Sequence, residues 1–286
     1  MSTTVTPDPR DPAQRVFRVK PSRPFFSLDI RELLRYHELL YVLVWRDVRV
    51  RYKQTALGVL WAVIQPLAAM VIFSIIFGHL AGIQSPYGVP YPLFVFTGLL
   101  PWQYFAACLS SSTQSVVGNA NLVTKVYFPR LIVPLAAVCS PVIDFLCAFC
   151  VLLGLFVFYS YPPHWHAIAI PVFLGMALLT AFGVGLWLSA LNTRYRDIPY
   201  LLPFITQIWF FLTPVIYPVT MVPQRWHWVI ALNPMSGVVD GFRWAVLGKG
   251  LPHYGVYALS ALVGVCLTTS GLWYFKRAER TFADVI

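Results

Sequence analysis

The segment WRDVRVRYKQTALGVLWAVIQP, residues 45–66, joins two very different kinds of sequence. Its first part carries one acidic residue, Asp47. It also carries four basic residues, which we call the basic collar: Arg46, Arg49, Arg51 and Lys53. Charge then disappears, because the 71 residues from Gln54 to Thr124 include no Asp, Glu, Lys or Arg. This run far exceeds the roughly 18 apolar residues that indicate a membrane span. We interpret the basic collar as the anchor of a first membrane-spanning helix.

The composition of the whole chain supports a membrane location. Of its 286 residues, 58% are hydrophobic and only 11% are charged, and the mean hydropathy is +0.67. Soluble domains contain about 25% charged residues, and a soluble core needs a polar surface that this chain cannot supply. The sequence therefore predicts an all-α integral membrane protein.

The amino-terminal part divides into two regions. Residues 1–26 contain five prolines and five basic residues, so we predict a disordered, basic, Pro-rich cytoplasmic tail and no signal peptide. Residues 27–286 are predicted to form one transmembrane domain. It begins with an amphipathic helix over Ser27–Trp45 that lies on the membrane surface or packs on a soluble partner. Its apolar face is expected to hold Ile30, Leu33, Leu34, His37, Leu40, Tyr41 and Val44.

Six later segments are long enough to cross a membrane, since each needs about 20 residues. They are predicted near 57–80, 93–116, 131–158, 167–191, 199–219 and 254–275. With both termini in the cytoplasm, 18 of the 21 Lys and Arg residues lie on the cytoplasmic side and 3 on the other. The positive-inside rule therefore predicts this orientation. The net charge of +10 follows from the same bias and does not indicate nucleic-acid binding.

Between the last two predicted spans, residues 218–252 contain two apolar pieces too short to cross. These are Trp226–Leu232 and Met235–Leu247, separated by Asn233-Pro234. One interpretation is a folded outer loop; the other, which we favour, is a short re-entrant helix pair with its ends buried in protein. Three tryptophans in this region favour an interface position.

Motifs for chemistry are scarce. No phosphate-binding loop of the form G-x-x-x-x-G-K-[ST] is present, so the chain is not expected to bind ATP itself or to contain a catalytic site. Cys147 and Cys150 form a C-x-x-C within an apolar span, where buried thiols are more common than a metal or redox pair. His164 and His166 alone are a weak metal signal, so no metal is predicted.

Asp144 falls near the middle of the third predicted span. An ionisable group at that depth is costly unless it faces protein or water, which makes function the first hypothesis. The alternative is a protonated or hydrogen-bonded residue that packs helices. A chain of such groups, as in proton-coupled carriers, is not evident.

Three motifs together resemble the ABC-2 type permeases, most of all the transmembrane subunits of exporters for O-antigen, capsule and teichoic-acid polysaccharides. The motifs are RDVRVRYKQTALGVLWAVIQP at 46–66, NANLVTKVYFPRLIVP at 119–134 and RYRDIP at 194–199. The resemblance covers residues 28–280 and omits the basic tail. It is specific for the family and poorly specific for the transported polymer.

The resemblance implies a homodimer in the bacterial cytoplasmic (inner) membrane, with each copy bound to a separate ATPase subunit that carries ATP and Mg. The dimer is expected to form a channel for a lipid-linked polysaccharide. Other readings stay open: an ABC-2 exporter of small molecules or lipids, a secondary transporter, or a membrane glycosyl- or acyltransferase. The enzyme reading needs converging acid–base groups, and no such cluster is evident.

The family pattern also assigns provisional roles to residues. The first cytoplasmic island resembles a coupling helix, although positive-inside anchoring also explains its charges; the predicted ATPase contacts are Asn119, Lys125, Tyr127, Phe128, Arg130, Arg194, Arg196 and Asp197. The first and fifth spans are expected to line the channel with Trp61, Gln65, Phe73, Gln207, Phe210, Phe211 and Tyr217, whose rings have lipid contact as an alternative role. An outer gate that moves as the polymer passes is predicted at Arg225, Trp226, Trp228, Asp240, Arg243 and Trp244. Its charges either hold the gate shut or meet lipid head groups.

Overall fold

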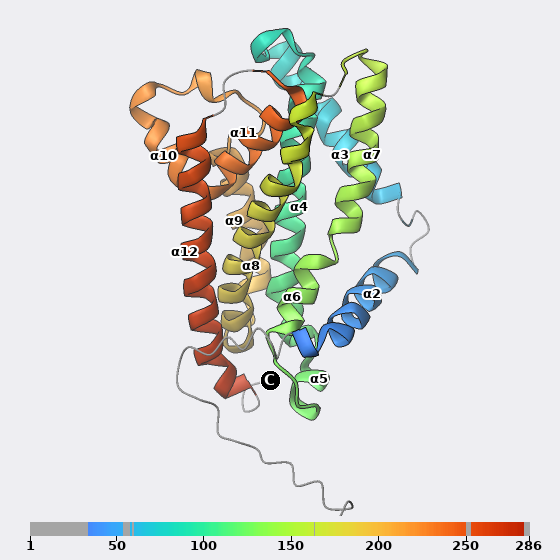
Figure 1. The fold of residues 1–286 in the computed structure, drawn as a ribbon, viewed down its shortest axis with the longest axis vertical. Helices are drawn as coiled ribbons and strands as arrows, with labels where there is room; N and C mark the ends of the chain where they lie inside the picture. Colours follow the sequence, from blue (N-terminus) through green and yellow to red (C-terminus); the bar gives the residue numbers. More distant parts are fainter. Residues whose placement is uncertain (1–33, 54–57, 59, 163, 250–252, 283–286) are drawn as a thin grey trace, which may run out of the picture.

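The computed structural model describes residues 34–53, 58, 60–162, 164–249 and 253–282, which form a bundle of helices (Figure 1). The predicted tail and residues 27–33 of the predicted amphipathic helix lie outside the described residues. No strand occurs in the described part, so the all-α class is confirmed there.

The first half of the chain contains, in order, α2 (His37–Lys53), α3 (Leu60–Phe73), the π-helix η1 (Ser74–Leu80), η2 (Pro86–Gly88), α4 (Tyr91–Gly118), α5 (Ala120–Lys125), α6 (Ile132–Cys139) and α7 (Val142–Phe158). The second half contains η3 (Trp165–Ala169), α8 (Ile170–Arg194), α9 (Ile198–Leu212), η4 (Val219–Met221), η5 (Gln224–Trp226), α10 (His227–Leu232), α11 (Pro234–Leu247), α12 (Tyr254–Ala278) and η6 (Glu279–Thr281).

Five stretches are long and apolar enough to cross a membrane: Leu60–Leu80, Tyr91–Gly118, Ile132–Phe158, Trp165–Arg194 and Tyr254–Thr281. The predicted fifth span, 199–219, is present as α9 but ends at Leu212. Thr213 is extended because it precedes Pro214, a position that disfavours helix. The fifteen residues of α9 cover about 22 Å, less than the ~30 Å hydrocarbon thickness.

Helix α4 forms the centre of the bundle. In its most apolar stretch 78% of the residues are buried, compared with 11% for Leu60–Leu80. Helices α3, α6, α7, α8, α9 and α11 all pack against it. Helix α4 is therefore enclosed by the other helices of the bundle.

Helices α8 and α12 approach each other closely at glycines. A Cβ on Gly183 would lie 2.6 Å from the backbone nitrogen of Thr268, and one on Gly271 would lie 2.3 Å from the carbonyl oxygen of Gly183. Neither distance is compatible with a side chain, so the two backbones touch. Small residues allow this kind of contact between membrane helices.

Helix α2 differs from its predicted form. The amphipathic helix was predicted to end at Trp45, but it continues through the basic collar to Lys53. Its inward face is also rotated: Leu43 and Val48 are buried, whereas Tyr41, predicted to face inward, is 68% exposed. This rotation brings Asp47 and Arg51 onto the same inward side, because residues four apart share a helix face.

The predicted helix pair between the last spans is present, with the break at Asn233-Pro234 as expected. Asn233 caps α11 by accepting a hydrogen bond from the backbone of Met235, and Pro234 occupies the first helical position. The two helices differ in environment, because α11 is buried against α4, α8 and α12 whereas α10 is mostly exposed.

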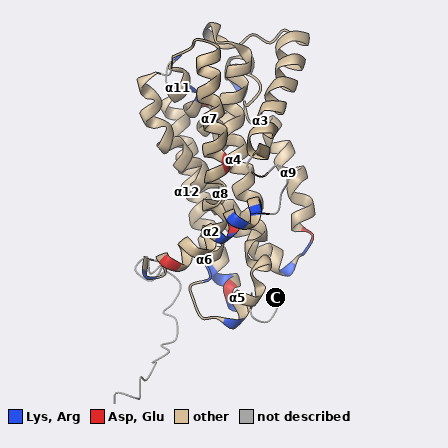
Figure 2. Ribbon diagram, turned by 90° about the vertical axis from the view of Figure 1, so that its right-hand side faces the viewer, with Lys and Arg blue, Asp and Glu red and all other residues tan. Residues whose placement is uncertain are grey.

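Charged residues gather at one end of the bundle, around α2, α5 and the carboxyl end of α12 (Figure 2). We call this the α5 end and the opposite one the α10 end.

Candidate functional site

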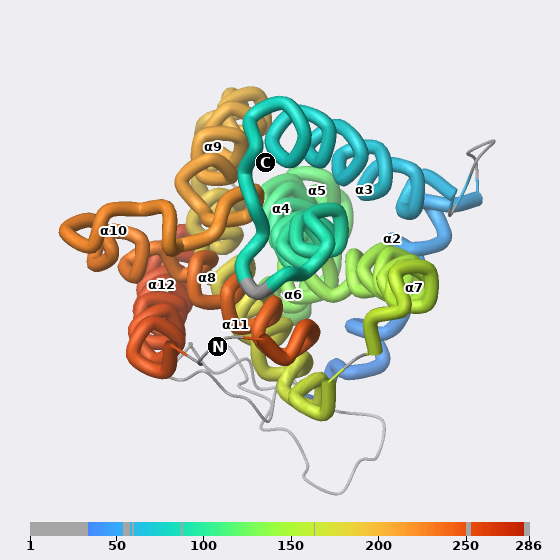
Figure 3. The backbone as a smooth tube through the Cα atoms, turned by 90° about the horizontal axis from the view of Figure 1, so that it is seen from above, coloured from blue at the N-terminus to red at the C-terminus, as the bar shows by residue number. Residues whose placement is uncertain are grey.

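A lateral face built by α3 and α9 carries the predicted pathway residues. The two helices lie along the same side of α4 (Figure 3), and the rings of Phe73 and Phe210 stack between them with centroids 5.6 Å apart. Leu202 is the one fully buried residue of α9, so most of this helix is without a partner in a single copy.

The seven predicted residues fall into two groups on this face. Four have exposed side chains: Trp61, Gln65, Gln207 and Phe211. The other three, Phe73, Phe210 and Tyr217, are half-buried. The Tyr217 hydroxyl donates a hydrogen bond to the carbonyl of Phe211, 3.2 Å away, which ties the chain after α9 back onto that helix. The exposed group thus combines two amides with two aromatic rings.

Helix α11 holds the end of α9 through its cap residue. The Asn233 side-chain oxygen accepts from the indole nitrogen of Trp209 at 2.9 Å, and its amide donates to the hydroxyl of Thr213 at 2.9 Å. Both partners are in the last turn or just past the end of α9. Asn233 therefore caps one helix and anchors another.

Arg243 makes a second connection from α11 to the same place. Its guanidinium donates to the carbonyls of Pro214 at 3.2 Å and Val215 at 2.8 Å, and lies 3.8 Å from the ring centre of Phe94. Arg243 is buried, so these carbonyls and the ring replace water around the charge. With Asn233, it connects α11 to the end of α9 and to the turn that follows.

The six predicted gate residues are thereby separated. Asp240, Arg243 and Trp244 belong to α11, where Asp240 accepts from Tyr257 of α12 at 3.1 Å and pairs with His253 at 3.0 Å. Arg225, Trp226 and Trp228 are exposed on η5 and α10. Hydrogen bonds thus tie α11 to α9 and α12, and the movement of the helix pair stays a prediction.

At the α5 end, the predicted coupling residues differ in the exposure of their side chains. Tyr127 is 85% exposed and Lys125 is exposed, but Phe128 is only 5% exposed and packs into its own chain. The guanidinium of Arg130 donates to the backbone carbonyl of Glu279, and that of Arg194 lies 5.6 Å from the Tyr195 ring. The Asn119 amide donates to the carbonyl of Ser115 at 2.8 Å, while Arg196 and Asp197 are exposed.

Asp144 has partners that the sequence did not reveal. The break between α6 and α7 at Ser140–Pro141 puts it in the first turn of α7. Its two carboxylate oxygens accept hydrogen bonds from Arg51 and from the hydroxyl of Tyr52, both of α2. Burial, together with the hydrogen bond to Asp144, raises the pKa of Tyr52 above its usual range. Asp144 is thus an ion-paired residue.

The weaker sequence signals have structural surroundings of their own. The rings of His164 and His166 stack on each other with centroids 4.4 Å apart, and His166 packs against Trp244 at 4.5 Å. Cys147 is half-buried and Cys150 exposed on α7. Among the described residues, no group of three or more His, Cys, Asp or Glu could hold a metal ion.

Comparison with known proteins places this arrangement in a family. The family model described as ABC-2 type transporter matches residues 38–247, from α2 to the end of α11. The chain belongs to the ABC-2 type transporter family. The matched region includes the α3–α9 face, the α11 connections and both partners of the Arg51–Asp144 pair.

Three relatives illustrate the range of similarity. The O-antigen export system permease protein RfbA of Klebsiella pneumoniae is 31% identical over 262 residues, which cover 91% of this chain and 100% of the relative. The polysialic acid transport protein KpsM of Escherichia coli is 22% identical over 231 residues, 78% of this chain and 89% of the relative. The inner membrane transport permease YadH of Escherichia coli (strain K12) is 26% identical over 201 residues, 65% of this chain and 75% of the relative.

Proposed function

We propose that this ABC-2 chain is the permease subunit of an ATP-driven exporter that moves a lipid-linked polysaccharide of the O-antigen or capsule type across the cytoplasmic membrane. Two copies form the channel, and two ATP-binding subunits hold ATP and Mg and supply the energy. The chain itself has no catalytic role. The relatives named for O-antigen export and polysialic acid transport support this choice of substrate.

The observation that carries the proposal is the unpartnered α3–α9 face with its exposed Gln65 and Gln207. Lipid contact explains exposed rings such as Trp61 and Phe211, but it does not explain amides at membrane depth. In a channel between two copies, amides exchange hydrogen bonds with successive sugar hydroxyls, and rings contact the apolar faces of sugars in any register.

The exit of this channel lies at the α10 end. Helices α9 and α11, joined through Asn233 and Arg243, form its wall. The mostly exposed segment from Val219 to Leu232 forms the movable lid, with Arg225, Trp226 and Trp228. In this arrangement α10 and α11 dip into the outer leaflet as a re-entrant pair. The interior position of α11 supports it, because non-helical backbone at membrane depth must be covered by protein.

The entrance lies at the α5 end, in the cytoplasm with both termini. The basic bias of the sequence supports this orientation. The ATPase subunit binds the exposed surface formed by Lys125, Tyr127 and the segment Arg194–Asp197. Phe128 and Arg130 act from behind this surface by fixing the loop to the bundle.

The test is reconstitution. The purified chain is expected to hydrolyse no ATP alone, to co-purify with an ATP-binding subunit, and in inverted membrane vesicles with that subunit to transport a lipid-linked polymer when ATP is added. ATP hydrolysis by the chain alone, or labelling of a terminus from outside the cell, contradicts the proposal.

A second candidate is an ABC-2 exporter of a small molecule or lipid. The similarity to YadH supports this candidate, because the name of that permease mentions no polysaccharide. The same vesicles decide between the two, because this candidate predicts ATP-dependent transport of lipid or small solute with no transport of the polymer.

A further inference from the structure

Asp144 has an isolated position in the sequence. It is the only acidic residue between Asp47 and Asp197, a stretch that includes four of the five candidate spans. A carboxylate in such surroundings is stable when a cation and hydrogen-bond donors accompany it, or when it takes up a proton. The fold must therefore supply its partners.

Both partners come from α2. Arg51 donates through Nη1 to Oδ2 of Asp144 and through Nη2 to the hydroxyl of Ser111, 3.2 Å away, while Tyr52 donates to Oδ1. Ser111 belongs to the central helix α4. One guanidinium thus joins α2, α4 and α7, and a lysine, which has a single nitrogen, would not reproduce this fork.

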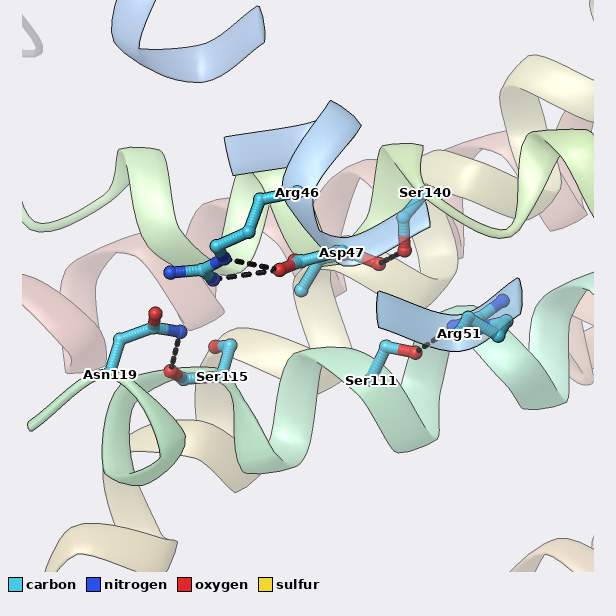
Figure 4. A network of polar contacts seen from close by, with 8 residues as sticks. Arg46, Asp47, Arg51, Ser111, Ser115, Asn119 and Ser140 are labelled. Atoms are coloured by element: carbon cyan, nitrogen blue, oxygen red, sulfur yellow. Dashed lines mark hydrogen bonds and ion pairs between the residues drawn. The ribbon is translucent and has the colours of Figure 1, made fainter. Parts of the chain in front are cut away.

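Arg51 differs from its neighbours in the basic collar. Arg46, Arg49 and Lys53 have exposed side chains, and Arg46 pairs with Asp47 on its own helix, with Nη2 and Oδ1 2.7 Å apart. Figure 4 shows Arg46 folded onto Asp47 while Arg51 reaches Ser111. The Arg51–Asp144 pair is only partly exposed, with side chains 34% and 27% accessible. In the described part of the collar, it is the ion pair that joins α2 to another helix.

We propose that Arg51 and Asp144 form a latch that fixes α2 to α7 and α4, and that α2 moves relative to the spans only when this carboxylate is released. Separating the pair leaves a partly buried carboxylate without its cation, which is unfavourable. The latch therefore gives α2 a defined paired position and opposes intermediate ones. Arg51 and Asp144 are positioning residues in this scheme.

The role of the latch in transport depends on the proposed function. The ATPase subunit would act on α2 from the α5 end, and the latch would transmit this movement to α7 and the central helix α4. Loss of the latch would then leave ATP hydrolysis in place but lower the amount of polymer moved per ATP.

The latch itself can be tested without the ATPase subunit. The native cysteines, of which Cys150 and Cys266 are exposed, are first replaced by alanine, and labelled chain is diluted with unlabelled chain so that distances within one copy dominate. Spin labels on cysteines at Val50 of α2 and Val157 of α7, both exposed, then report the distance between these helices in the purified full chain in lipid nanodiscs. The two labelled positions leave Arg51 and Asp144 in place. We expect a single narrow distance distribution in this background and in Arg46→Ala, which removes a collar charge outside the latch.

Four latch variants give distinct expectations. Arg51→Ala leaves Asp144 without its cation and should broaden or shift the distribution. Asp144→Asn should have a smaller effect on the distance distribution. Arg51→Ala combined with Asp144→Asn should give a narrower distribution than Arg51→Ala alone, because the unpaired carboxylate is no longer present. Arg51→Lys should restore the pair in part, since lysine reaches Asp144 but not Ser111 as well. Size-exclusion elution of each variant checks that it is folded.

Two outcomes overturn the latch: equal distributions for Arg51→Ala and Arg46→Ala, or a double variant more disturbed than Arg51→Ala alone. In vesicles with the ATPase subunit, Arg51→Ala should lower polymer export per ATP by about tenfold while the double variant recovers part of it. If the unaltered exporter moves no polymer, the proposed function fails, and the distance measurement still decides the latch.

Discussion

A single methyl group added to the central helix tests the connection between α9 and α11. Gly98 of α4 lies under the guanidinium of Arg243, and a Cβ there would be 2.3 Å from Nη2 of Arg243 and 2.8 Å from the carbonyl oxygen of Val215. The guanidinium could swing aside, but the carbonyl is backbone. Gly98→Ala therefore forces the turn after α9 to move or breaks its bond to Arg243.

The expected cost follows from three contributions. Alanine gains up to about 1 kcal/mol over glycine within a helix. Overpacking a filled site costs about 1–3 kcal/mol, and losing the hydrogen bond from a charged donor costs about 1.5–3 kcal/mol. Together these give a net loss of about 1.5–5 kcal/mol, which lowers the melting temperature of a protein of this size by roughly 3–20 °C.

The matched control is Gly154→Ala on α7, where an added Cβ has no atom within 4 Å. Its melting temperature should stay unchanged or rise by up to about 3 °C, since only the helix propensity changes. Both variants are melted in the same detergent and followed by far-ultraviolet circular dichroism. If Gly98→Ala and Gly154→Ala have the same melting temperature, the close contact at Arg243 does not constrain the turn after α9.

Three further predictions concern the proposed exporter. Tyr127→Ala should reduce the amount of ATP-binding subunit that co-purifies with the chain by about tenfold, as loss of an interface aromatic does. Phe128→Ala should instead lower the yield of folded chain, because it empties a buried site. If Tyr127→Ala yields as much folded chain and as much partner as the unaltered chain does, Tyr127 is not part of the interface. Gln65→Leu and Gln207→Leu together should slow polymer export several-fold with assembly and ATP hydrolysis retained, because leucine cannot hydrogen-bond to sugar hydroxyls; unchanged export would mean that these amides do not line the path. Cross-linking Trp228→Cys between two copies should block export, while the same treatment of the exposed Trp165→Cys on η3 should not; continued export with the Trp228 position cross-linked would exclude α10 as the lid.

The positions of most helices were predictable from local sequence. Apolar runs bounded by proline and polar residues predicted α4 over 93–116, where it occupies Tyr91–Gly118. Asn233-Pro234 predicted the boundary of α10 and α11, because Asn caps helices and Pro fits the first turn. These signals come from residues that are neighbours in the sequence, so they do not depend on contacts with distant parts of the chain.

Contacts between distant residues were not predictable in the same way. Arg51 and Asp144 are separated by 93 positions, and their pairing depends on the rotation of α2 and on the break at Ser140–Pro141. The predicted face of α2 was chosen without the collar, so it included Tyr41 and excluded Arg51. Inclusion of the collar would have shown Leu43, Asp47 and Arg51 at helical spacing on one side. Likewise, Asn233 was predicted to break the pair, but its bond to Trp209 is tertiary.

Hydropathy also fails to separate burial in protein from exposure to lipid, because both environments are apolar. Of the five candidate spans, α4 has the lowest mean hydropathy and is by far the most buried, whereas Leu60–Leu80 is more apolar and 11% buried. The small polar residues of α4 account for this inversion. Ser112 and Thr113 are fully buried, and the Thr113 carbonyl accepts the Asn192 amide of α8 at 3.0 Å. Serine, threonine and glycine in a span therefore indicate contact with other helices. The more apolar helix α3, which is little buried in one copy, is expected to contact lipid or a second copy.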